Sequence, residues 1–114
     1  ENAAGSFIVR NALKYMEDHY SEKLTLSKVA EETFVSQWHL SKLLNRQEEK
    51  NFSEILKQIR VEHAKELMKE KAYRIVDIAE LVGFTDVAHF SRVFKKLEGI
   101  SANEYRNTRI SLSE

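Results

Sequence analysis

The sequence contains no cysteine and no proline, and glycine occurs at only three positions. Without cysteine the chain cannot form a disulfide, a zinc–thiolate site or a thiol nucleophile, and nothing indicates an oxidising compartment. Absent proline and scarce glycine disfavour turn-rich β architectures and favour helices. Charged residues interrupt every long segment, so no apolar run reaches the length of a membrane span or a secretion signal. We therefore expect a soluble, cytoplasmic, helical protein.

A net charge is also absent, because 18 basic residues balance 18 acidic ones. Nucleic-acid binders commonly carry a basic excess, so this balance speaks against DNA as a partner. The charges are unevenly spread, however. Residues 83–97 carry three basic side chains and one acidic one, whereas acidic residues outnumber basic ones over residues 1–34. A neutral chain of this kind can still present a basic face.

The stretch from Arg74 to Lys96 has the pattern of two short helices joined at a glycine turn. The first helix places four apolar residues on one face: Ile75, Ile78, Ala79 and Val82. Gly83 can take the positive φ that often follows a helix, and Asp86 can cap the next one. That next helix points Phe90, Val93, Phe94 and Leu97 inward, and Val87, Ala88, Ser91, Arg92 and Lys95 outward. This is the plan of a helix-turn-helix, whose second helix enters the major groove of DNA.

The same plan occurs about fifty residues earlier. Thr25 is an N-cap for a helix over Leu26–Thr33, and Ser36 is an N-cap for a second candidate recognition helix that runs to about Asn45. The outward residues of this helix are Gln37, Trp38, Ser41, Lys42 and Asn45. A lone tryptophan is more often a core residue, but leucines at 40, 43 and 44 already fill the inward positions. We therefore place Trp38 on the outer face, one turn from Lys42.

A long helix is expected between the repeats. Asn51 and Glu54 form a capping box, and an apolar stripe continues to about Lys71. About 18 helical residues span roughly 27 Å, and a separation of roughly 34 Å would let both recognition helices enter successive major grooves. An earlier helix is expected over Phe7–Tyr20 and a short closing helix after Ser101. The predicted division is 1–6 tail or linker remnant, 7–50 first helix-turn-helix subdomain, 51–71 linker helix, 72–106 second helix-turn-helix subdomain and 107–114 frayed tail.

These residues resemble the DNA-binding domain of AraC/XylS-type bacterial transcription regulators. The resemblance covers about Leu24 to Arg106 and is most specific in the segment 78–96 and the segment 99–106. It implies an all-α fold of seven helices, in which two helix-turn-helix subdomains joined by a linker helix bind an asymmetric DNA site as a monomeric module. It also implies an N-terminal sensor or receiver domain and RNA polymerase as partners. The phrase over residues 15–26 looks like the response-regulator subgroup.

The sequence departs from the family pattern at five positions. Leu44, Glu49 and Ala102 stand where the family usually has Phe, Gly and Pro, and Arg74 stands where a Ser or Asp cap is common. Phe34 stands where many members have Gly, so the first turn has to be built without a residue that adopts positive φ easily. The departures at residues 34, 44 and 49 bear on the geometry of the first helix-turn-helix.

Groove chemistry and the resemblance together nominate two sets of contact residues. The predicted base-reading residues are Gln37, Trp38, Lys42, Asn45, Val87, Ala88 and Arg92. The predicted phosphate contacts, which set the register of the protein on DNA, are Ser36, Ser41, Arg46, Thr85, Lys95 and Lys96. In this scheme Arg92 reads guanine, Gln37 and Asn45 read adenine, and Val87 and Ala88 meet thymine methyl groups.

Other chemistries find little support in the sequence. The four histidines form no i, i+4 pair with one another and no HExxH frame, and no phosphate-binding glycine loop or nucleophile elbow is present. We therefore expect no enzyme, no metal site and no cofactor. The alternative is a helical protein–protein interaction module with weak or no DNA binding, since a helix-turn-helix fold does not fix function. The neutral net charge is the best support for that alternative.

Overall fold

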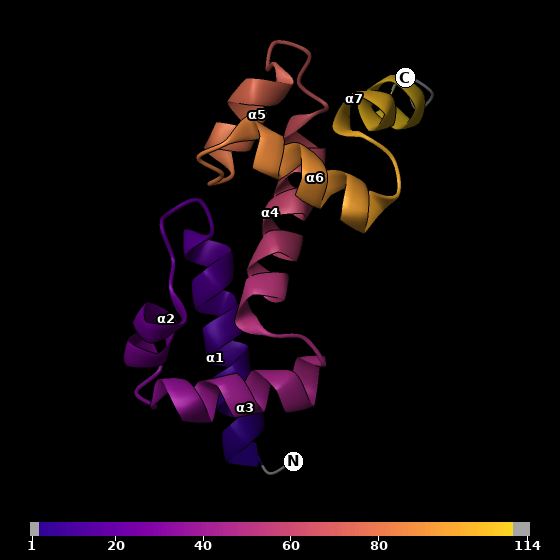
Figure 1. The fold of residues 1–114 in the computed structure, drawn as a ribbon. Coiled ribbons are helices and arrows are strands. Elements are labelled where there is room, and N and C mark those ends of the chain that lie inside the picture. The colour runs from indigo at the N-terminus through magenta and orange to yellow at the C-terminus, as the bar shows by residue number, and fades with distance from the viewer. Residues whose placement is uncertain (1–2, 111–114) are drawn as a thin grey trace. The chain divides into compact units, whose positions relative to one another are not determined.

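The chain is all-helical in the computed structural model, which describes residues 3–110. Seven α-helices and one π-helical turn follow one another over that range (Figure 1): α1 (Ala3–His19), α2 (Leu26–Glu32), α3 (Gln37–Glu48), α4 (Phe52–Leu67), α5 (Ile75–Leu81), α6 (Val87–Glu98), α7 (Ala102–Tyr105) and η1 (Arg106–Ile110). The predicted fold class is thereby confirmed. None of the described helices combines the length and the apolar character needed to cross a membrane.

The chain divides within α4 into a first unit, residues 1–59, and a second unit, residues 60–114. The helix predicted as a linker over residues 51–71 is thus shared between the units. Its first half supplies Ile55 and Leu56 to the core of the first unit. Its second half supplies Val61, Ala64 and Met68 to the buried residues of the second unit.

The first unit packs α1 against both α2 and α3 (Figure 1). One face of α1 is buried at Val9, Ala12 and Met16, and the core is completed by Val29, Ala30, Leu40, Leu43 and Leu44. The same periodicity that predicted the helices therefore supplies the core. The apolar spacing predicts Phe7 or Ile8 as the first inward residue of this helix, but Phe7 is exposed, Ile8 is half-buried and Val9 is the buried one of the three.

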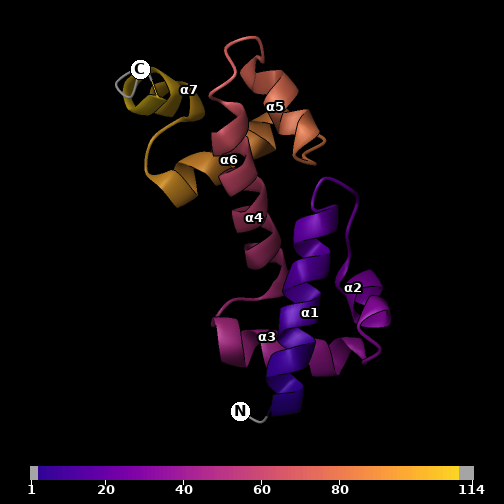
Figure 2. The ribbon, with the colours of Figure 1, turned by 180° about the vertical axis from the view of Figure 1, so that it is seen from behind.

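The second unit packs α5 against α6, and α7 against α6 (Figure 2). Its core contains a row of aromatic rings that meet at tilted or edge-on angles. Phe90 lies 5.3 Å from Phe84 and 5.8 Å from Phe94 between ring centroids, and Tyr105 lies 5.5 Å from Phe94. These contacts favour one fixed arrangement of α6 in the second unit.

The predicted N-caps form the hydrogen bonds expected of them. The Thr25 hydroxyl accepts from the Lys28 N–H at 3.1 Å, and the Ser36 hydroxyl accepts from the His39 N–H at 3.1 Å. Asn51 and Glu54 form both bonds of a capping box, each at 2.9 Å. These bonds satisfy N–H groups that the first turn of a helix leaves without a partner.

Several element boundaries differ from the predictions. Residues 3–6 of the predicted tail are helical, because α1 begins at Ala3; residues 1 and 2 lie outside the described range. The helix α4 ends at Leu67 instead of about Lys71, and the backbone beyond it closes into tighter turns. Arg106 donates to two carbonyls beyond the helix end, those of Met68 at 3.1 Å and Glu70 at 3.0 Å. Residues 107–110 of the predicted frayed tail form most of η1, and residues 111–114 lie outside the described range.

The inward position predicted for Leu97 is wrong. Leu97 is exposed in the last turn of α6, whereas the next residue, Glu98, is only 19% exposed. Glu98 turns toward α4, where its carboxylate lies 3.3 Å from the amine of Lys65. The ion pair, and not the apolar stripe, therefore occupies the inner face at this end of the helix.

Among residues 3–110, four take a positive φ, and they fall at matching places in the two repeats. Gly83 has φ 107° and Gly99 has φ 86° in the second unit. The residues at the same places of the first unit are Phe34, with φ 62°, and Glu49, with φ 57°. The second unit thus builds these two turns with glycine, whereas the first unit builds them with residues that carry a side chain. The left-handed backbone is strained at those two residues of the first unit.

Candidate nucleic-acid interface

The helix α6 presents the outward face that the sequence predicted. Its N-cap is Asp86, whose carboxylate accepts the Ala88 N–H at 3.0 Å. Phe90, Val93 and Phe94 are buried, which fixes the rotation of the helix. The opposite face is exposed and consists of Val87, Ala88, Ser91, Arg92 and Lys95. Its small residues lie near the N-terminus and its cations further along.

The cations of α6 have no acidic partner among residues 3–110. Arg92, Lys95 and Lys96 are all exposed, and no ion pair within the described part of the chain includes any of them. Lys95 and Lys96 lie in the last turn, where a positive charge is favourable to the helix dipole. These three cations are therefore available to an anionic group such as a phosphate, or to neutral hydrogen-bond acceptors such as O6 and N7 of guanine.

The second unit holds α6 against α4 through a partly buried cluster around Lys65. The Lys65 amine lies 2.8 Å from the Glu62 carboxylate and 3.3 Å from that of Glu98, and Lys65 is only 21% exposed. Although burial disfavours its charged form, the hydrogen bonds to Glu62 and Glu98 raise the pKa of Lys65 above its ordinary value. This cluster ties the C-terminal end of α6 to α4 within the second unit.

The turn before α6 also rests on α4. The guanidinium of Arg60 lies 5.6 Å from the ring centroid of Phe84, which follows Gly83 and is buried. Burial lowers the pKa of Arg60 below its ordinary value. A cation over the face of an aromatic ring is attracted to it, so the contact with Arg60 stabilises the position of Phe84 in the turn.

The outward face of α3 carries fewer predicted DNA-contacting cations than that of α6, namely Lys42 and Arg46. Trp38 is 70% exposed, and the Lys42 amine lies 4.3 Å from its ring centroid, a cation–π contact one turn along the helix. Gln37 and Asn45 are also exposed. The Asn45 side-chain amide donates to the Ser41 carbonyl at 3.0 Å, which leaves its oxygen and one N–H outward.

The surface of each unit carries the residues predicted to contact DNA. Twelve of the thirteen are exposed, and Ser41 is half-buried. Val87, Ala88 and Arg92 share one face of α6, and Trp38 and Lys42 touch each other on α3. Their roles on DNA remain predictions.

Sequence reasoning missed two interactions in the second unit, one between α4 and α6 and one at the start of α5. One is the Lys65–Glu98 pair, which joins residues 33 positions apart and has no signal in local periodicity. The other involves Asp77, which accepts the Arg74 backbone N–H at 2.9 Å and receives two further bonds from the Arg74 guanidinium. An acidic residue three positions into a helix is a known capping signal, so this contact could have been found.

The helix-turn-helix domain model matches residues 29–108 of the chain. Among curated proteins, the uncharacterised HTH-type transcriptional regulator YijO of Escherichia coli K12 is 35% identical over 92 residues. That match covers 81% of this chain and 32% of YijO. Among the first curated relatives, the matched part is between 14% and 35% of the relative's own length.

Two solved structures are similar over nearly the whole chain. The C-terminal domain of AraT, a response regulator from Geobacillus stearothermophilus, is 41% identical with a TM-score of 0.84, covering 90% of this chain and 86% of that one. An AraC-type DNA-binding-domain regulator from Chromobacterium violaceum is 26% identical with a TM-score of 0.87, covering 95% and 96%. Both likenesses extend across both units.

Proposed function

Because the chain belongs to the AraC-type helix-turn-helix family of transcription regulators, we propose that it reads an asymmetric promoter site with α3 and α6 in successive major grooves. Family membership confirms the predicted sequence-specific binding of double-stranded DNA in transcription regulation. The family is one of DNA-binding regulators and not of enzymes, and the alternative of a protein–protein interaction module is not favoured.

The single observation that carries the proposal is the outward face of α6. It combines small apolar residues at the N-terminal end with Arg92, which has no acidic partner in the described part of the chain. Arginine can donate a bidentate pair to guanine O6 and N7, and Val87 and Ala88 are short enough to meet thymine methyl groups. We assign base reading in the second unit to these three residues.

In the first unit the base-reading residues are Gln37, Trp38, Lys42 and Asn45. Trp38 offers an exposed apolar surface to the groove, and its ring holds the Lys42 amine nearby. Asn45 bonds to the Ser41 carbonyl through one N–H, so its remaining N–H and its oxygen are free to pair with adenine. Gln37 lies one turn before Ser41 at the start of α3 and can pair with adenine in the same way.

The phosphate contacts are assigned to hydroxyl residues before or within the recognition helices α3 and α6 and to cations further along these helices. They are Ser36, Ser41, Arg46, Thr85, Lys95 and Lys96. Ser36 accepts the His39 N–H through its oxygen, so its hydroxyl hydrogen stays available to a phosphate. Such contacts set the register without reading sequence.

We assign the chain to the C-terminal end of a longer cytoplasmic regulator, as in the response regulator AraT whose C-terminal domain it resembles. The preceding domain would be a sensor or a receiver domain. RNA polymerase is the second proposed partner, since a promoter-bound regulator acts on transcription through it.

Selection of bound sequences from a random duplex pool at low salt tests the proposal. Two enriched boxes about one helical turn apart are expected if both recognition helices read bases. A single box would limit base reading to one unit, and Trp38→Ala and Arg92→Ala would then identify which one. A folded chain that enriches no sequence would refute the proposal.

A further inference from the structure

The turn between α2 and α3 exposes an aromatic side chain at a strained position. Phe34 has φ 62° and is 92% exposed. The second unit builds the same turn with Gly83, which has no side chain to expose. A phenylalanine at this place gains nothing from burial and strains the backbone, so its presence indicates a contact outside the module.

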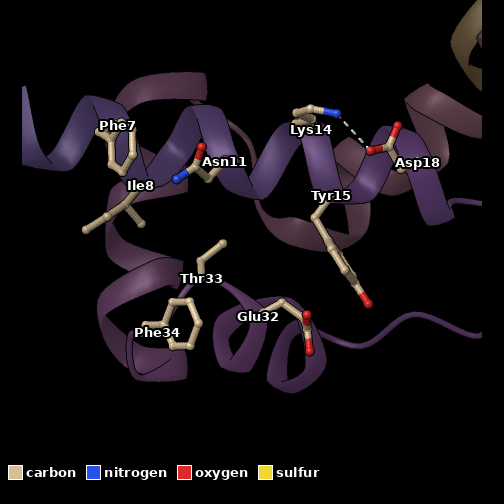
Figure 3. Close-up of a pocket in the computed structure, with 9 residues that line it drawn as sticks. All are labelled: Phe7, Ile8, Asn11, Lys14, Tyr15, Asp18, Glu32, Thr33 and Phe34. Carbon is tan, nitrogen blue, oxygen red and sulfur yellow. Dashed lines mark hydrogen bonds and ion pairs between the residues drawn. The ribbon is translucent and has the colours of Figure 1, made fainter.

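Phe34 borders a groove that lies between α1 and the end of α2 (Figure 3). The groove encloses about 480 Å³. Ile8 projects from α1 toward Thr33 and Phe34 on the opposite wall, whereas Tyr15 projects from α1 toward Glu32 (Figure 3). Phe7, Ile8 and Phe34 make one end of the groove apolar and aromatic, and Phe7 is 57% exposed.

The other end of the groove is charged but balanced within the chain. The Lys14 amine lies 3.0 Å from the Asp18 carboxylate, and Glu32 lies 3.4 Å from the Lys28 amine. The lining residues include two carboxylates, Asp18 and Glu32, and one cation, Lys14, which pairs with Asp18, while the exposed Arg10 lies beside the groove, 5.9 Å from the Phe7 ring centroid. A lining with more carboxylates than cations is a poor surface for phosphates. The apolar end of the groove instead suits another protein surface that supplies an apolar side chain.

We infer that this groove is the docking surface for the regulatory domain that precedes the module in the intact regulator, an inference that rests on the proposed function. The module is only 14% to 35% of the length of its curated relatives, and the relative AraT carries it as a C-terminal domain. The groove is built on α1, the first helix of the module. A domain tethered there is present at a high effective concentration, so a small surface anchored by Phe34 suffices to hold it.

The test compares the intact regulator with the 114-residue chain, using Phe34→Gly. Glycine should preserve the turn, as Gly83 does in the second unit, so loss of folding is not expected. Val76→Ser is the matched control, because Val76 is an exposed apolar residue on α5, outside the groove. Both variants are made in both lengths of the protein.

Amide hydrogen exchange over residues 7–18 and 32–36 reports docking directly. In the intact regulator, exchange should be at least about fivefold slower than in the 114-residue chain, a modest protection for a low-affinity contact. Phe34→Gly should abolish this difference, and Val76→Ser should keep it. Equal exchange in the two lengths would overturn the inference, as would protection that appears in the 114-residue chain as its concentration rises, since the occupant would then be a second copy.

DNA affinity provides the second readout. Phe34→Gly should change the affinity of the intact regulator for the selected site by at least about fivefold, a typical coupling between sites. The 114-residue variant should stay within about twofold of its parent. The same change in both lengths would overturn the inference, because Phe34 would then act within the module. If neither length bound DNA, the proposed function would fail, and hydrogen exchange would still decide the docking.

Discussion

Replacing Glu49 by glycine should stabilise the first unit by about 0.5–1 kcal/mol. Glu49 ends α3 with φ 57°, and its exposed side chain makes no hydrogen bond or ion pair within the described residues. A left-handed conformation costs a residue with a Cβ about 1–2 kcal/mol, and glycine gives back about 0.5–1 kcal/mol through its larger unfolded-state entropy. The difference between these two quantities is the expected gain.

Three controls separate backbone strain from charge and from glycine itself. Glu49→Ala removes the carboxylate, whose negative charge is unfavourable at the C-terminal end of a helix, but it keeps the strained backbone. Glu48→Gly places glycine inside the last turn of α3 and should cost about 1 kcal/mol. Gly99→Ala introduces the same strain into the second unit and should cost about 0.5–1 kcal/mol from the backbone alone, because an added Cβ would meet nothing within 4 Å.

Urea unfolding followed by far-UV circular dichroism measures these changes in free energy. In thermal unfolding, Glu49→Gly should raise Tm by about 2–5 °C. The comparison that decides is Glu49→Gly against Glu49→Ala. If glycine were no more stable than alanine at this position, the cost assigned to the left-handed backbone would be refuted.

Arg92→Ala should cost about 1–3 kcal/mol on the selected site and relax one base position, measured by binding to single-base variants of that site; an unchanged preference would refute base reading. Lys95→Ala should weaken binding to all sequences about equally and lower the slope of log K against log salt by about one; a sequence-selective loss would contradict its phosphate role. Asp77→Asn tests a pH dependence: hydrogen bonds from the Arg74 side chain and backbone hold the pKa of Asp77 below 3.8. The stability that Asp77 contributes should be present at neutral pH and disappear as the pH falls below 3.8. The free energies of unfolding of parent and variant, measured in urea, should therefore converge in acid. A difference that stays constant with pH would contradict this role of Asp77.

Local chemistry made much of the fold predictable from sequence. The caps at Thr25, Ser36 and Asp86 and the capping box at residues 51 and 54 each use partners within three residues, so a short segment contains all the information. The repeated spacing of apolar residues likewise predicted which faces of α3 and α6 are buried. These faces in turn left the predicted DNA-contacting residues on the outside.

Long-range contacts accompany two of the errors. Where α4 ends early, Arg106 binds the carbonyls of Met68 and Glu70, residues 38 and 36 positions away in the chain. Next to the exposed Leu97, Glu98 pairs with Lys65. Neither partner can be read from a window of sequence around the residue concerned.

The helical fold, the two helix-turn-helix repeats and the family can be read from the amino acids alone, because periodicity, caps and turn glycines act over a few residues. The left-handed backbones of Phe34 and Glu49, at places where the second unit has glycine, come from the folded unit, since packing of the flanking helices imposes the turn whatever residue occupies it. The tertiary structure also created the groove beside Phe34, because its two walls come from α1 and α2, which are separate in sequence and meet only when the first unit packs.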